Sequence, residues 1–191
     1  MRAFAFCICL LSHLALTLPA NAAPAHYSLQ PESSTVGFET DFGTDKITGK
    51  MPISSAELTL DFDNIPGSKI DVVLNAAAAE ASFPFAAQAM KGPKVLDTAE
   101  FPTIRFQSTS LAKNGEGAAV EGLVTIRGVT RPMRMQAVVW RQKGQAEGDL
   151  SKLSIRLTGT IIRSQFAAVG WNDMVGDEVR LDILARIARK D

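Results

Sequence analysis

Cysteine and histidine are almost absent from this chain, which has two of each among 191 residues. Cys7, Cys9 and His13 all lie near its start. If that segment is removed, no thiol remains to form a disulfide, attack a substrate or bind zinc. A Ser-His-Asp triad needs a histidine held in a rigid site. We expect the remaining histidine, His26, to lie on frayed surface chain near the new N-terminus.

An excess of charge of either sign is also lacking, since 20 lysines and arginines face 20 aspartates and glutamates. Nucleic acid requires a concentrated basic face, so we expect no nucleic-acid partner. Arg127, Arg131 and Arg134 come nearest to a basic cluster, and we interpret them as solvated strand ends. No glycine-rich phosphate loop precedes a helix.

The N-terminus has the layout of a signal peptide. Arg2 precedes an apolar stretch from Ala3 to Leu18, and Ala20-Asn21-Ala22 is a small-x-small cleavage site. The apolar stretch is shorter than the roughly 20 residues of a membrane span. We therefore predict a signal peptide over residues 1–22, cleaved after Ala22, and one exported periplasmic domain over residues 23–191. A domain without disulfides is compatible with that compartment.

Beyond this segment, apolar and polar residues alternate with period two, most clearly over residues 153–161 and 179–187. Such alternation predicts antiparallel strands with one covered and one wet face. Similar strands are expected over residues 35–42, 56–62, 70–74, 103–110, 120–126 and 133–139. About eight strands joined mostly by short turns favour an all-β fold, a meander that closes into a barrel.

Residues 75–90 break this alternation and are rich in alanine, which favours helix. Because Pro84 is tolerated only at a first turn or outside it, we expect a short helix over Phe85–Lys91. A second short helix is expected after Pro93. Placed between strands, these one or two helices would cap one mouth of the barrel.

Phenylalanine and methionine are abundant, with ten and six copies. An eight-stranded barrel has room for its own side chains or for one small ligand, so a filled core and a hollow lumen both stay open. Met133 and Met135 share a face and would form an adaptable wall. Phe83, Phe85 and Met90 would form an apolar gate.

Carboxylate pairs are the remaining candidates for catalysis. Asp61 and Asp63 share the polar face of a predicted strand, and we expect them on a water-facing surface. Asp173 and Asp177 lie close to Glu178 in a second group. Paired carboxylates hydrolyse glycosides when they lie about 5–10 Å apart. The second group is only loosely similar to a calcium loop, whose Asp-x-Asp-x-Asp-Gly order is absent.

Several segments resemble the YceI-like family: Ser34-Thr35-Val36-Gly37-Phe38, then residues 100–106, 120–132, 163–166 and 175–181. They follow the family order over almost the whole chain after residue 22. The turn at residues 128–132, Gly-Val-Thr-Arg-Pro, is the most specific. Ser33-Ser34 and Phe101 depart from the family's His-Ser and tyrosine, close to the expected mouth.

The resemblance implies a lipocalin-like antiparallel barrel that holds a long apolar molecule, such as a polyisoprenoid or isoprenoid quinone. It also implies a homodimer and a part in transport or stress response. With catalytic and metal signatures missing, we predict a lipid-binding protein without enzyme activity, metal or resident cofactor. The inward strand faces and the family segments together predict the ligand-binding residues: Val36, Phe38, Leu60, Phe62, Val72, Phe83, Phe85, Met90, Phe106, Val124, Met133, Met135, Leu157, Phe166 and Trp171.

Two other functions stay open at this point. The protein could be an accessory of membrane electron transport that shuttles or senses quinone beside a membrane cytochrome. It could also be a hydrolase that uses Asp173 and Asp177. Arg105, Arg163 and Trp171 lie near predicted strand ends and are candidates for contact with a polar head group.

Overall fold

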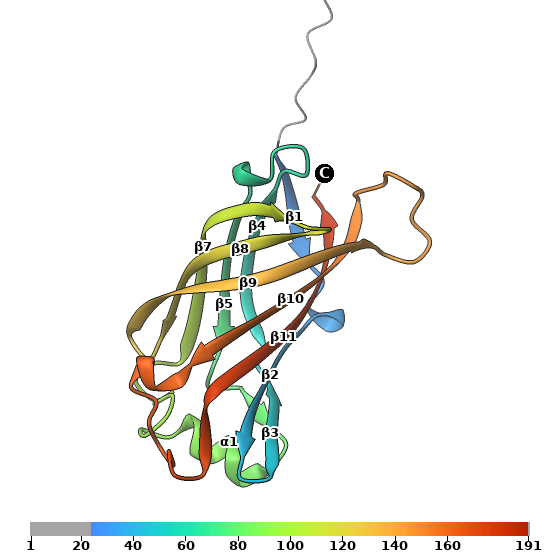
Figure 1. Ribbon diagram of the computed structural model, residues 1–191. Coiled ribbons are helices and arrows are strands. Elements are labelled where there is room, and N and C mark those ends of the chain that lie inside the picture. Colours follow the sequence, from blue (N-terminus) through green and yellow to red (C-terminus); the bar gives the residue numbers. More distant parts are fainter. Residues whose placement is uncertain (1–23, 191) are drawn as a thin grey trace, which may run out of the picture.

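The computed structural model describes residues 24–190, and the predicted signal peptide lies outside the described residues. One antiparallel sheet curls into a barrel, and an α-helix lies across its lower end (Figure 1). The helix α1 spans Pro84–Lys91. The strands are β1 Ala25–Leu29, β2 Thr35–Phe42, β3 Asp45–Lys50, β4 Ile53–Leu60, β5 Lys69–Asn75, β6 Glu80–Ala81, β7 Thr103–Asn114, β8 Gly117–Ile126, β9 Val129–Arg141, β10 Lys152–Ile162 and β11 Val175–Arg189. Three 3-10 helices, η1 Pro31–Ser33, η2 Ile65–Gly67 and η3 Arg163–Phe166, lie in connections.

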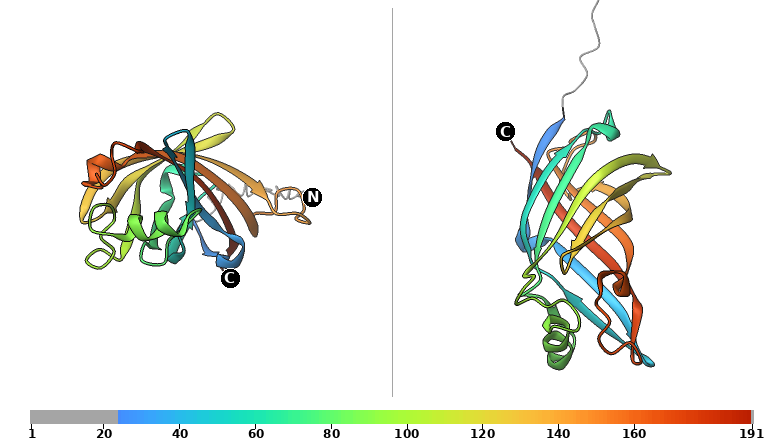
Figure 2. Two further views of the ribbon diagram at one scale, coloured as in Figure 1. Left: turned by 90° about the horizontal axis from the view of Figure 1, so that it is seen from below. Right: turned by 90° about the vertical axis from the view of Figure 1, so that its left-hand side faces the viewer.

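Eight of the strands close into a ring. Neighbours follow the order β1–β4–β5–β7–β8–β9–β10–β11, and β11 pairs with β1 to complete the circle. Figure 2 shows this ring from below and from the side. Every strand of the ring therefore has a partner on both sides over at least part of its length. The predicted fold, an all-β antiparallel barrel of about eight strands, is confirmed.

The ring forks at β11, which has two successive partners along one edge. Ile187 of β11 faces Leu29 of β1, whereas Leu181 faces Phe38 of β2. The β1–β4 pair therefore closes the upper half of the barrel, and the β2–β3 hairpin forms the wall of the lower half (Figure 1). On its far side β3 meets only the two-residue strand β6 among the described residues.

Residues 76–102 cover the lower end beside β3 and form a lid. Its helix α1 starts at Pro84, where the missing N–H would have no partner within the helix. The second helix that we expected after Pro93 is wrong, because this stretch forms turns. Two of its amides bond back to α1: Leu96 N–H donates to Met90 (2.9 Å) and Thr98 N–H to Lys91 (3.0 Å).

The predicted strands correspond to β2, β4, β5 and β7–β11. Strands β1, β3 and β6 were missed, because each is short and lacks a long alternating run. The expectation that His26 lies on frayed chain is also wrong. His26 belongs to β1, where its Nδ1 lies 3.1 Å from the hydroxyl of Thr59 on β4.

Candidate functional site

The barrel encloses a cavity of about 930 Å³ whose wall is almost entirely apolar. Every ring strand except β1 contributes several lining residues, and α1 and two loops complete the lower end. The polar side chains along the wall are Thr40, Asp61, Ser68, Lys113, Glu116 and Arg163. Such a wall offers dispersion contacts and few hydrogen bonds, so it suits an apolar guest.

Strand alternation produces this wall. On β11, Leu181, Ile183 and Ala185 line the cavity, while Asp182 between them faces outward and pairs with Arg156 of β10 (2.6 Å). Arg156 itself lies between two lining residues. The same apolar and polar alternation that predicts strands therefore separates the lumen from the wet outer face.

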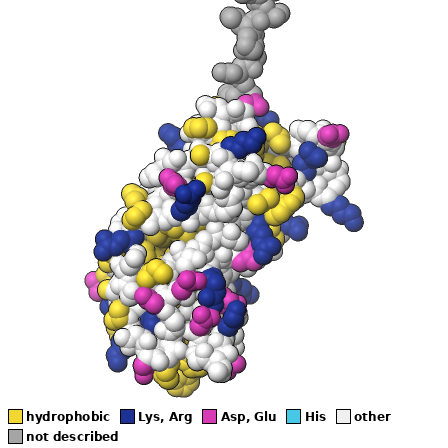
Figure 3. Space-filling model, viewed as in Figure 1, with side chains coloured by type: hydrophobic (Ala, Val, Ile, Leu, Met, Phe, Trp, Pro, Cys, Tyr) yellow, Lys and Arg dark blue, Asp and Glu magenta, His cyan; other side chains and the backbone are white. Residues whose placement is uncertain are grey.

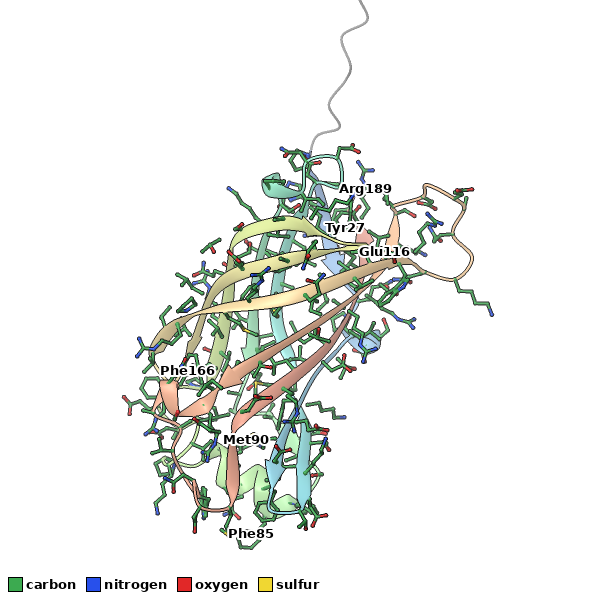
Figure 4. The ribbon with its side chains drawn as sticks, in the orientation of Figure 1. Tyr27, Phe85, Met90, Glu116, Phe166 and Arg189 are labelled. Carbon is green, nitrogen blue, oxygen red and sulfur yellow. The ribbon has the colours of Figure 1, made fainter. Side chains whose placement is uncertain are left out.

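Figure 4 labels residues that lie at the two ends of the cavity. The upper end lies at the β7–β8 hairpin beside Glu116, and the lower end lies at α1, where Met90 and Phe85 are found. The cavity thus runs along the barrel. Its elongated form fits a chain-like molecule better than a compact one.

A small cluster of buried hydrophobic side chains closes the upper end of the barrel. It consists of Tyr27, Leu58, Leu60, Leu153 and Ile187. The Tyr27 hydroxyl donates to the carbonyl of Leu150 (2.9 Å), and burial raises the pKa of Tyr27. Its ring packs edge-on against Phe62, with 6.2 Å between centroids. Because Leu58, Leu60, Phe62 and Ile187 also line the cavity, the lumen ends against this cluster.

At the lower end, the buried guanidinium of Arg163 organises the loop that follows η3. It donates to the carbonyls of Ala168 (2.6 Å), Gly170 (2.8 Å), Val175 (2.9 Å) and Gly176 (2.9 Å). No carboxylate of the described residues pairs with it. These four bonds satisfy most of its five N–H groups, so its first role is to hold this loop.

Arg127 joins the lid to the same loop. Its guanidinium donates to the carbonyl of Pro93 (2.6 Å) and to that of Ala167. Arg127 lies at the end of β8 and stays partly exposed, as interpreted, but its side chain also carries these two bonds. In this turn Arg127 has a left-handed backbone (φ 50°), and so does Gly128 after it (φ 72°). The Arg127 side chain thereby links the lid to the loop that follows η3.

Two further sequence interpretations need correction. Asp61 is buried rather than water-facing, because its carboxylate caps the turn after β4 by accepting the amides of Asp63 (3.0 Å) and Asn64 (2.7 Å). Arg105 faces outward, away from any head group in the lumen. It forms a two-pronged pair with Asp71, and this guanidinium lowers the pKa of the Asp71 carboxyl.

Each residue predicted to bind ligand lines the cavity: Val36, Phe38, Leu60, Phe62, Val72, Phe83, Phe85, Met90, Phe106, Val124, Met133, Met135, Leu157, Phe166 and Trp171. Their contact with a ligand stays a prediction. Met51, Ile65, Val95 and Ala168 also line it and were missed. They lie in connections, where no alternation marks the inward face.

Asp173 and Asp177, the acidic residues considered for a hydrolase, lie outside the lumen. Asp177 accepts the amide (2.8 Å) and the hydroxyl (2.6 Å) of Ser164, and neither it nor Asp173 lines the cavity. Within residues 24–190, no group of three His, Cys, Asp or Glu side chains is arranged to hold a metal ion. No helix in this part of the chain is both long and apolar enough to cross a bilayer.

An eight-stranded antiparallel barrel around an apolar lumen defines a class of proteins built to enclose a small molecule. Within that class, the chain belongs to the YceI-like family, whose domain matches residues 27–187.

Curated relatives include a UPF0312 protein of Yersinia pestis (strain Pestoides F). It is 28% identical over 120 residues, which are 61% of this chain and 62% of that protein. The match thus spans less than two thirds of the relative's length.

Solved structures share the fold at low identity. BcnA of Burkholderia cenocepacia has a TM-score of 0.75 at 18% identity, over 83% of this chain and 99% of that one. A polyisoprenoid-binding domain from Saccharophagus degradans, implicated in plant cell wall breakdown, has a TM-score of 0.63 at 12% identity. It covers 87% of this chain and 99% of its own.

Proposed function

We propose that this protein sequesters or carries a long-chain apolar lipid, such as a polyisoprenoid or isoprenoid quinone, in the lumen of its barrel. It does so in the periplasm and without catalysis. The observation that carries this proposal is the cavity of about 930 Å³, which runs along the barrel between walls of aliphatic and aromatic side chains.

Its volume lies near the upper end of the range of roughly 300–1,000 Å³ for small-molecule pockets. Each buried methylene contributes about 0.8 kcal/mol, so even part of a prenyl chain supplies a large gross driving force. Ordering of the chain offsets much of it. The polyisoprenoid-binding domain with the same fold supports the choice of ligand class.

Mass spectrometry of organic extracts tests the proposal directly. The protein is isolated from its native compartment without detergent, and we expect one isoprenoid lipid per chain. N-terminal sequencing of the same sample tests cleavage after Ala22. Repeated recovery of protein without lipid, together with failure to bind a fluorescent farnesyl probe, would overturn the proposal.

A neighbouring pair on β5 provides matched variants. Val72 lines the lumen, whereas Val73 does not and is paired with Arg105 of β7. Val72→Asp puts a carboxylate where the lipid chain would lie, and we expect it to weaken farnesyl-probe affinity by about tenfold or more. Val73→Asp should leave this affinity unchanged. Urea unfolding of both variants separates lost binding from lost folding.

A further inference from the structure

Exposed apolar side chains gather around the lower mouth. Two come from the lid, Phe83 and Phe85, with 46% and 84% of their surface exposed. Three come from the loop before β11: Val169 (53%), Trp171 (40%) and Met174 (48%). Phe85 lies at the tip of the molecule in Figure 4, and hydrophobic atoms emerge at the same tip in Figure 3. We call these five side chains the rim.

The rim continues into the lumen. Phe83, Phe85, Trp171 and Met174 are exposed to water and also line the cavity. Contiguous exposed apolar side chains mark surfaces that meet a partner. Here four of the five rim side chains also line the cavity, so a lipid tail that leaves an apolar phase at the rim would meet apolar side chains at the entrance of the barrel.

The middle of the lid, residues 81–96, carries only positive charge, which complements a phospholipid surface. Residues 81–96 contain no aspartate or glutamate and carry Lys91 and Lys94. The Lys94 ammonium lies 6.0 Å from the centre of the Trp171 ring. Tryptophan favours the boundary between lipid head groups and acyl chains, and lysines near it are attracted to phosphates. Glu80, Asp97 and Glu100 of the lid and Asp173 of the neighbouring loop are acidic, so this attraction is confined to the stretch 81–96.

The opposite end of the barrel differs in character. Its turns at residues 61–68 and 114–117 contain none of the large apolar residues that are strongly exposed. The remaining side chains of that kind lie on the barrel wall: Leu123 in β8, and Val139 and Trp140 near the upper end of β9, where they pair with β10 next to Leu153. Five of the eight large apolar side chains that are strongly exposed among the described residues therefore gather at the lower mouth.

We propose that the lower mouth docks on a phospholipid bilayer. The rim enters the boundary of the acyl layer, and Lys91 and Lys94 lie at the phosphates. This inference rests on the proposed function, because the bilayer is then the phase that supplies or receives the bound lipid.

The two tryptophans of the chain allow a direct test. In Trp140→Phe the emission comes from the rim, and in Trp171→Phe it comes from the side wall. The probe is a vesicle of phosphatidylethanolamine and phosphatidylglycerol with brominated acyl chains. We expect vesicles to shift Trp171 emission to the blue and quench it, and to leave Trp140 unchanged. Equal responses of both tryptophans, or none, would overturn the proposal.

Because Trp171 also lines the cavity, brominated lipid taken into the lumen would quench it as well. Co-sedimentation with unlabelled vesicles separates the two causes. Val169 belongs to the rim but does not line the cavity. We expect Val169→Asp to lower the vesicle-bound fraction about tenfold, since a charge at the membrane boundary is unfavourable. Leu123→Asp, an equal change on the side wall, should leave it unaltered.

Both variants should keep the farnesyl-probe affinity of the unchanged protein. Wild-type protein that binds the probe but no vesicles would overturn docking and leave the proposed function standing. Protein that binds no farnesyl probe would remove the proposed function, whatever the vesicles show. Equal loss of vesicle binding in Val169→Asp and Leu123→Asp would also count against docking by the rim.

Discussion

Phe106 on β7 lies against Gly122 on the neighbouring strand β8. A Cβ atom added at Gly122 would approach the Cζ atom of Phe106 to 2.5 Å. Gly49 and Phe38 form a second pair of this kind, with a corresponding distance of 2.2 Å. At both glycines the absence of a side chain leaves room for the ring of a phenylalanine that lines the lumen.

The first prediction concerns this packing. Gly122→Ala would press the new methyl group against the Phe106 ring and against the backbone carbonyl oxygen of Gln107 (2.4 Å), and such overpacking destabilises a core by about 1–3 kcal/mol. We expect a decrease of that size in the free energy of unfolding, measured with urea. Gly176→Ala is the control, because its Cβ would meet its nearest neighbour at an ordinary 3.4 Å. Equal stability of the two variants would contradict this account of the glycine.

The second prediction concerns Arg163. Arg163→Met removes four hydrogen bonds to backbone carbonyls of the mouth loop. We expect the free energy of unfolding to fall by about 2 kcal/mol or more, with faster hydrogen exchange at residues 167–176. Arg163→Lys should rescue little of this loss, because an ammonium cannot reproduce the planar fork. Arg156→Met, at an exposed pair, should destabilise the protein much less than Arg163→Met does.

The third prediction concerns pH. Arg105 lowers the pKa of Asp71 in the folded protein. The stabilisation from this pair is therefore fully present above the ordinary carboxyl pKa of about 4 and is lost as the pH falls through the lowered value. Urea unfolding over a pH series should show Asp71→Asn losing less stability than the unchanged protein in this acidic window. In an Arg105→Gln background, Asp71→Asn should have little further effect on the pH dependence.

The fourth prediction concerns ligand removal. A lipid that binds only the folded barrel stabilises it by mass action, by about 2.7 kcal/mol at a hundredfold excess over Kd. We expect protein stripped of lipid to melt at a lower temperature, and added geranylgeraniol to raise the Tm in a concentration-dependent manner. Val72→Asp should reduce this rise. An unchanged Tm at saturating geranylgeraniol would argue against binding in the lumen.

Much of the cavity wall follows from the sequence because strands alternate strictly. Once Leu157 and Val124 are assigned to apolar faces, the pleat fixes the direction of their neighbours. The structure accordingly places both on the cavity. The same logic fails at Asp61, which continues an alternating run but caps the turn just beyond the end of β4.

The loops could not be predicted in this way. Arg163 meets the carbonyls of residues 168–176 only because the chain turns back on itself after η3, and no sequence period records such a turn. Arg127 likewise reaches Pro93, 34 positions earlier in the chain. Strand β1 has five residues, too few for a clear periodic pattern, although it completes the ring.

The fork at β11 divides the barrel into two mechanical parts. The ring closes through β1 in its upper half, where Tyr27 and its neighbours pack tightly. In the lower half, the outer edge of β3 is paired only with the two-residue strand β6 of the lid among the described residues. Loosening there leaves the ring of eight intact, and weakly held segments open most readily. We therefore predict that the upper half governs how long the protein stays folded, and that the region beside β3 governs how long a bound lipid would stay in the lumen.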